Sequence, residues 1–198
     1  MKIRLFAWLL LVFAAAFVLF SSENLLLQQQ IAEKTVRLHV VANSDSEADQ
    51  AHKLEVRDAV LEEVNRLTKG CQDAQEARTV IEENLTCIAQ AAAAVSPYEI
   101  RVSLGTERFD TRDYDTFTLP AGKYPALRVN IGAAEGKNWW CVVFPSLCTA
   151  ATSDELEDCA QVGGFNDEET DLITGGEESY TFRFKALEWL QDLFGWFS

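Results

Sequence analysis

The feature that most constrains the fold is an unbroken apolar run of sixteen residues near the N-terminus, at positions 5–20. Lys2 and Arg4 precede it, and a short basic region followed by an apolar region is typical of an export signal. At ~1.5 Å per helical residue the run reaches roughly 24 Å, which is shorter than the ~30 Å hydrocarbon core of a bilayer. We therefore interpret residues 1–22 as a signal peptide or signal anchor, and expect the folded domain to be built from the residues that follow.

Two outcomes of export fit the sequence. The alanines at 14–16 satisfy the small-x-small rule of signal peptidase, which favours cleavage. An uncleaved anchor is the competing outcome, because the leucines at 25–27 follow closely and are suited to the membrane interface. In both cases we expect the chain to be exported. We expect membrane contact through this N-terminal segment, with residues 5–20 as the anchor where they are retained.

The charge of the chain excludes one class of function and marks one segment. A formal net charge of −14 argues against nucleic-acid binding, since neutralising phosphates needs a basic face. Ten of the 31 carboxylates lie within 149–179, which has no Lys or Arg. Two Gly-Gly pairs interrupt this stretch, and we interpret it as an acidic flexible linker with solvated charges. Its carboxylate spacing matches no EF-hand loop, and neither a metal nor a cofactor is predicted.

The middle of the chain predicts a single α+β domain over 35–148, preceded by a polar lead-in at 23–34. Alternating β-branched residues over 35–42 indicate a strand. A capping box formed by Ser44 and Glu47 predicts a helix that runs to about residue 68, and a second helix is expected over 73–95.

Four strand candidates follow the predicted helices, at 98–104, 109–119, 126–132 and 139–144. The last two are predicted to be joined by a hairpin loop at 132–136. This order of elements indicates an antiparallel or mixed sheet with two long helices on one face. An amphipathic helix is predicted over 180–198, and it can pack on its own domain, on a membrane or on a partner.

Five cysteines are spread over the chain without a C-x-x-C pair, which argues against zinc ribbons and thioredoxin-type sites. Cys141 and Cys148 lie close in sequence, on either side of Pro145. A turn at this proline brings them within reach of a disulfide, and two small buried thiols are the alternative.

Two stretches resemble the stage II sporulation protein R family. The first is V-R-L-H-V-V-A-N-S-D-S at 36–46 with V-R-D-A-V at 56–60. The second spans 119–148 and contains the unusual string N-W-W-C at 138–141 before F-P-S-L-C at 144–148. With the signal segment the resemblance covers roughly residues 1–148 and a strip around 182–189. The loop at 132–136 has fewer glycines than the family pattern, and the acidic stretch departs from that pattern.

The resemblance implies a signalling role and no catalytic activity. Members of this family are secreted from the forespore into the space between the forespore and mother-cell membranes. There they trigger a membrane-embedded protease, stage II sporulation protein GA, to process the precursor of sigma-E. On this basis we expect partner-contacting residues within the two matching stretches. The candidates are His39, Asn43, Ser44, Asp45, Arg57, Asp58, Arg128, Asn138, Trp139 and Trp140.

The catalytic alternative is an exported hydrolase acting on cell-wall material, with His39 activating Ser44 or Cys141. No spacing in the sequence requires this arrangement, and capping and turn formation account for residues 43–46. Binding has better local support, because Trp139 and Trp140 point to opposite faces of a strand. One tryptophan can enter the core while the other anchors an interface, and burial of both is the alternative. The sequence therefore favours a binding protein over an enzyme.

Overall fold

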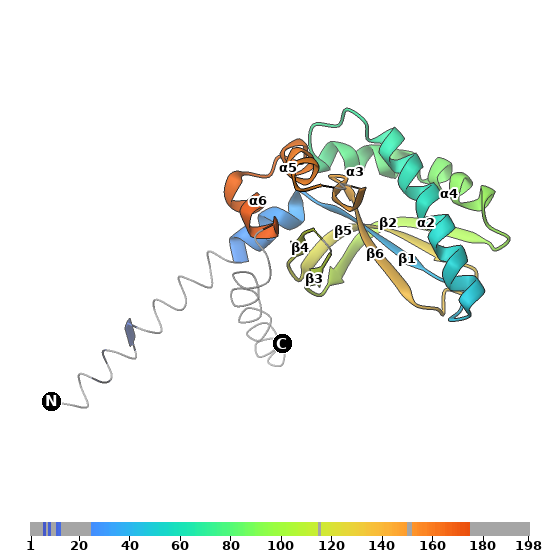
Figure 1. Ribbon diagram of the computed structural model, residues 1–198, viewed down its shortest axis with the longest axis horizontal. Coiled ribbons are helices and arrows are strands. Elements are labelled where there is room, and N and C mark those ends of the chain that lie inside the picture. Colours follow the sequence, from blue (N-terminus) through green and yellow to red (C-terminus); the bar gives the residue numbers. More distant parts are fainter. Residues whose placement is uncertain are drawn as a thin grey trace.

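The computed structural model describes residues 6, 8, 11–12, 25–114, 116–149 and 152–174 (Figure 1). The predicted signal segment lies almost wholly outside these residues, and the C-terminal helix predicted over 180–198 lies wholly outside them. In the part of the chain that is described, no helix combines the length and the apolar character needed to cross a membrane.

The domain is built on a four-stranded mixed sheet with the strand order β2-β5-β1-β6. The central strand β1 (Val36–Val41) pairs parallel with β5 (Gly122–Ile131) and antiparallel with β6 (Asn138–Phe144). Strand β2 (Ile100–Phe109) pairs antiparallel with β5. This confirms the predicted α+β class with a mixed sheet. Among the strands that the structure describes, β6 lies at an edge of the sheet, so no described strand lies beside one side of its main chain.

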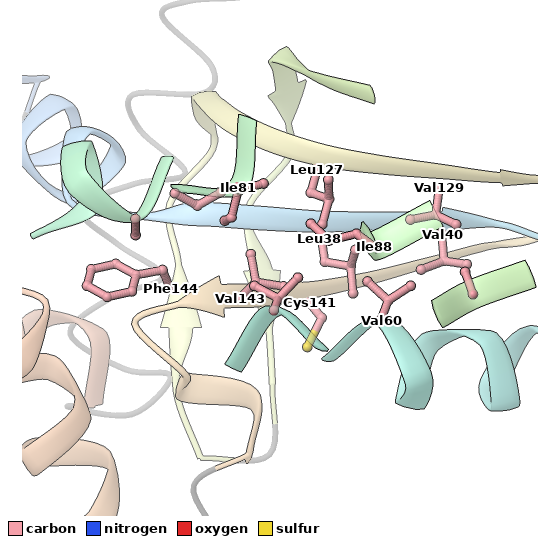
Figure 2. Close-up of a cluster of buried hydrophobic side chains, with 14 of the residues drawn as sticks. Leu38, Val40, Val60, Ile81, Ile88, Leu127, Val129, Cys141, Val143 and Phe144 are labelled. Carbon is pink, nitrogen blue, oxygen red and sulfur yellow. The ribbon is translucent and has the colours of Figure 1, made fainter. Parts of the chain in front are cut away.

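Three helices cover one face of the sheet: α2 (Glu47–Leu67), α3 (Ala74–Glu83) and α4 (Leu85–Ala94) (Figure 1). The alternating apolar residues of the strands meet the apolar stripes of these helices in the main core (Figure 2). Its fully buried side chains include Leu38, Val40, Val60, Ile81, Ile88, Leu127, Val129 and Val143.

The two helices predicted from the sequence are three in the structure, because the second one breaks. Asn84 ends α3 and begins α4, and its side-chain Nδ2 donates to the carbonyl of Val80. The start of α2 also differs from the prediction. Ser46 caps it by accepting from the amide of Asp49, whereas the Ser44 hydroxyl donates to the Asp49 carboxylate.

The predicted hairpin at 132–136 is wrong, because β5 and β6 are not neighbours in the sheet. Both pair with β1, and their connection passes across the end of that strand. The amide of Gly136 donates to the carbonyl of Ala42, and the amide of Glu135 donates to that of Asn43. Strand β1, which comes much earlier in the sequence, thus lies between β5 and β6. Local turn signals cannot reveal this arrangement.

The acidic stretch also differs from its prediction. Where a flexible linker is expected over 149–179, the structure has helices α5 (Ser153–Val162) and α6 (Asp167–Thr174). Thr152 caps α5 by accepting from the amide of Glu155. Leu156 and Ala160 lie one helical turn apart and are buried. Most of the charges face outward, with Glu169 as the buried exception, while this apolar side packs on the domain. The segment therefore has a helical pattern that its high charge conceals.

A second core lies at one end of the sheet, where α5 and α6 meet a helix over 25–33 and the short strands β3 (Arg112–Asp113) and β4 (Thr118–Leu119) (Figure 1). Its buried members include Leu27, Ile31, Phe117, Leu119, Val142, Leu156 and Leu172. The predicted polar lead-in is therefore largely helical. The predicted strand at 109–119 is instead the end of β2 followed by this small hairpin.

Candidate functional site

A groove of about 760 Å³ runs along the free edge of β6. Residues of α2 form one wall, and residues 112–114 and 116–117 around the β3–β4 hairpin form the other. The floor is the first half of β6, and the short helix η1 (Leu147–Thr149) contributes further lining. The groove therefore gathers side chains from three separate parts of the sequence around one unpaired strand edge.

Trp139 and Trp140 contribute to this groove from opposite faces of the sheet, as strand alternation predicts. Trp139 is 36% exposed, and the guanidinium of Arg57 lies 4.6 Å from the centre of its ring. The same guanidinium forms an ion pair with Asp58. Trp140 has Arg112 on one side, 5.4 Å from its ring centre. The groove thus carries two aromatic surfaces, each beside a cation.

The main chain of β6 faces the groove at alternate residues. The amide of Val142 donates to Sγ of Cys148, 3.0 Å away, so it points away from β1. Because main-chain direction repeats every two residues in a regular strand, the amides and carbonyls of Asn138 and Trp140 face the same way. In the part of the chain that the structure describes, Cys148 therefore occupies the edge at Val142, and no strand pairs with it along Asn138 and Trp140.

A polar cluster around His39 supports the Trp140 side of the strand. The His39 ring stacks on Trp140 with 3.8 Å between ring centres, and only 4% of the residue is exposed. Its Nδ1 lies 2.7 Å from the carboxylate of Glu107, and its Nε2 lies 2.9 Å from Oδ1 of Asn138. Arg128 reaches the other oxygen of Glu107 at 3.4 Å. Both ring nitrogens are engaged, and the cluster fixes the position of Trp140.

The two nucleophiles considered for a hydrolase are not joined to His39 in this arrangement. Cys141 forms a disulfide with Cys148 and belongs to the core on the helix side of the sheet. The Ser44 hydroxyl donates to Asp49 at the end of β1. The disulfide, with 6.1 Å between its Cα atoms, instead closes the turn after β6 and holds η1 beside the groove.

Three of the candidate residues hold a corner of the sheet that is separate from the groove. The side chain of Asn43 donates from Nδ2 to the Asp49 carboxylate and accepts at Oδ1 from the main-chain amide of Ala133. Asp45 accepts from the main-chain amide of Lys137. Ser44 completes this set. These contacts tie the start of α2 to the connection between β5 and β6. The structure therefore gives Asn43, Ser44 and Asp45 a structural role.

Asp49 is the centre of this corner. Its carboxylate accepts from the Ser44 hydroxyl at 2.5 Å, from the Asn43 amide at 2.9 Å and from the Tyr98 hydroxyl at 2.8 Å. In that order of importance these donors stabilise the charged form and lower the pKa of Asp49 from 3.8 to about 2.

This lowered pKa predicts a pH-dependent contribution to stability. The folded pKa lies below the unfolded value, so the contribution is fully present above about pH 4 and is lost as the pH falls towards 2. We expect Asp49→Asn to lower the free energy of unfolding at pH 7, and the difference from wild type to shrink between pH 4 and pH 2. Urea unfolding of both proteins at several pH values measures it. A difference that does not change with pH would contradict this assignment.

The sequence did not identify several residues of the groove and its support, among them Glu107, Arg112, Tyr114 and Phe117. Alternation along β2 places Glu107 on one face of the sheet but does not show which residues lie beside it. Its contact with His39 depends on the order of the strands. Within the described ranges, no group of three or more His, Cys, Asp or Glu residues is arranged to hold a metal ion.

Comparison with known proteins gives two matches. The family model of stage II sporulation protein R matches residues 32–154, which contain the sheet, the groove and the His39 cluster. The stage II sporulation protein R of Bacillus subtilis (strain 168) is 33% identical over 189 residues, with 83% of each chain covered. No solved structure matches the chain.

Proposed function

The chain belongs to the stage II sporulation protein R family, and from this premise we propose that it is an exported signal that activates a membrane-embedded protease. The partner is a protease of the stage II sporulation protein GA type, and the outcome is processing of the sigma-E precursor. The chain acts after secretion across the forespore membrane into the intermembrane space, with its N-terminal segment cleaved or retained as an anchor.

The observation that carries this proposal is the groove along the open edge of β6. An unpaired strand edge has main-chain donors and acceptors that an added strand can satisfy, and flanking pockets read its side chains. Here the outward-facing main-chain groups of Asn138 and Trp140 lie beside Trp139, which is 36% exposed and offers an aromatic surface next to the guanidinium of Arg57. We assign an extended segment of the extracytoplasmic part of the protease to this groove.

Activation by binding requires a difference in affinity between two states of the protease. To move an equilibrium from 1:99 to 99:1, a ligand must bind the active state about 10⁴-fold more tightly. Interface tryptophans each account for about 2–4 kcal/mol in truncation experiments, and a rigid edge strand loses little entropy on binding. Contacts at Trp139 give this selectivity when the active state of the protease presents the extended segment and the inactive state does not.

The hydrolase alternative has less support. Both nitrogens of His39 are engaged by Glu107 and Asn138, the Cys141 sulfur is in a disulfide, and the Ser44 hydroxyl is bonded to Asp49. A general base has to reach the proton that it removes. We therefore propose a binding role for this chain.

The test is co-expression of the full chain with its protease and the sigma-E precursor in a non-sporulating host. Trp139→Ala removes the exposed anchor, and we expect precursor cleavage to fall at least about tenfold, which corresponds to about 1.4 kcal/mol of lost affinity. A form lacking residues 1–22 is expected to give no cleavage. Cleavage is followed on a gel, with the amount of each variant measured in the same samples.

Two further variants serve as a control for Trp139→Ala and as a test of the hydrolase alternative. Val162→Ala removes an exposed apolar side chain on α5, away from the groove, and is expected to leave cleavage unchanged. His39→Gln keeps a polar side chain but abolishes imidazole chemistry. Full loss with His39→Gln together with normal cleavage by Trp139→Ala would favour the hydrolase and overturn the groove.

A further inference from the structure

A second groove, of about 940 Å³, lies between the helix over 25–33, helix α3 and the neighbouring ends of β2 and β5. Three cations from three elements line it: Arg78 on α3, Arg108 on β2 and Lys123 on β5. It has no role in the proposed contact with the protease, because it is lined by other strands and another helix than the β6 groove.

The charge of this groove is not balanced locally. Among the described residues, no carboxylate forms an ion pair with Arg78, Arg108 or Lys123. Glu33 is the one acid in the described lining, and it accepts a hydrogen bond from Gln29. These three cations create a local positive potential on a chain whose net charge is −14. Such a potential attracts anionic surfaces.

Exposed apolar side chains lie beside these cations. Leu25 lines the groove and is 42% exposed, and Leu26 is 60% exposed. Leu27 and Ile31 of the same helix are buried in the second core, so the helix cannot roll to hide its first two leucines. Cations beside exposed aliphatic residues form the combination that binds membrane interfaces carrying anionic lipids.

The chain length determines what this surface can reach. The apolar run ends at Phe20, and only residues 21–24 separate it from Leu25. Five residue steps span at most about 17 Å when fully extended. If the run stays in the bilayer as an anchor, the groove is held beside the lipid headgroups. If the chain is cut after the alanines at 14–16, four apolar residues at 17–20 remain immediately before the same surface.

We propose that this surface, formed by Arg78, Arg108, Lys123 and the exposed leucines, docks the folded domain on the anionic headgroups of the membrane from which its N-terminal segment emerges. Docking in this orientation is favoured further because the acidic remainder of the domain is repelled by the same lipids. The docking proposal rests on the expected membrane contact of the N-terminal segment. It does not depend on the protease, so membrane docking and protease activation can fail separately.

The experiment measures protection of one lysine. The full chain is added to vesicles of phosphatidylcholine, with or without phosphatidylglycerol, and treated with a membrane-impermeant acetylating reagent. Acetylation of Lys123 is compared by mass spectrometry with that of Lys69 and Lys137, which are also exposed but lie outside this groove. We expect acetylation of Lys123 to fall about fivefold on the anionic vesicles, with little change at the two reference lysines. About 0.5 M salt is expected to remove the protection, since it screens the attraction.

Variants and anion competition make the test decisive. Arg78→Glu with Arg108→Glu is expected to abolish the protection of Lys123, whereas Lys69→Glu with Arg101→Glu, a matched charge reversal elsewhere, preserves it. Equal acetylation of Lys123 on both kinds of vesicle would overturn the proposal. Protection by inorganic phosphate in detergent, without vesicles, would also overturn it and indicate a site for a small anion.

Discussion

Replacing Gly136 with alanine is expected to lower the free energy of unfolding by about 2–3 kcal/mol, the cost of forcing extra volume into a packed site. A Cβ atom at this position would overlap the main-chain carbonyl of Ser44 and would lie 3.0 Å from the Cβ of Ala42. Neither obstacle is the end of a flexible side chain. The connection from β5 to β6 therefore has to move away from the end of β1 and weaken the bond from the Gly136 amide to the Ala42 carbonyl.

Gly105→Ala is the matched control, since it is the same chemical change in the middle of β2. Nothing lies within 4 Å of a Cβ atom built at Gly105. Alanine reduces the entropy of the unfolded chain relative to glycine, so this variant is expected to gain up to about 0.5–1 kcal/mol. Chemical denaturation of the three proteins measures both changes. Equal effects of the two substitutions would contradict the close approach at the end of β1.

This crossing also shows where local sequence patterns stop being informative. Alternation locates β1, and the run of β-branched residues marks it as a strand. Alternation does not show that β1 lies in the middle of the sheet. That central position is the reason that Arg37 and His39 are as deeply buried as their apolar neighbours. The glycine at 136 reads as a turn residue between consecutive strands, whereas its actual constraint comes from Ser44, far away in the sequence.

The candidate site divides in the same way. Trp139 and Trp140 could be predicted to lie on opposite faces, because that follows from strand periodicity alone. Glu107 could not be connected with His39, because their contact passes across β5 and depends on the strand order. The residues around Ser44 are a recognisable polar cluster in the sequence, but the same residue types occur in turns and in binding sites. The contacts of Asn43 and Ser44 with Asp49 show that this cluster has a structural role.

In the acidic stretch the signals were present in the sequence, and charge density concealed them. Thr152 with Glu155 and Asn166 with Glu169 each have the three-residue spacing of a helix cap and its partner. In the structure Asn166 Oδ1 accepts from the amide of Glu169, and Glu169 accepts from the amide of Asn166. High net charge describes a segment as a whole, whereas folding depends on whether one side of it is apolar.

Glu169 also carries the contact that attaches this segment to the domain. Its side chain is fully buried, and both carboxylate oxygens accept from Nζ of Lys34, with the longer of the two distances 2.7 Å. Lys34 follows the helix over 25–33, so the pair connects that helix with α6 across the second core. An ion pair between buried or half-buried groups is costly to break from one side, because the remaining charge loses its partner.

Glu169→Gln is therefore expected to lower the free energy of unfolding by about 2–3 kcal/mol, less than the loss for a fully buried pair because Lys34 keeps 31% exposure. Glutamine can still accept from the amide of Asn166, so the change isolates the ion pair from the helix cap. Glu168→Gln removes the same charge from an exposed neighbour on α6 and is expected to have little effect. Hydrogen exchange provides the second measurement, and faster exchange should be confined to 25–33 and 152–174. Uniformly faster exchange that includes β1 and β5, or equal effects of the two substitutions, would mean that the segment is not attached through this pair.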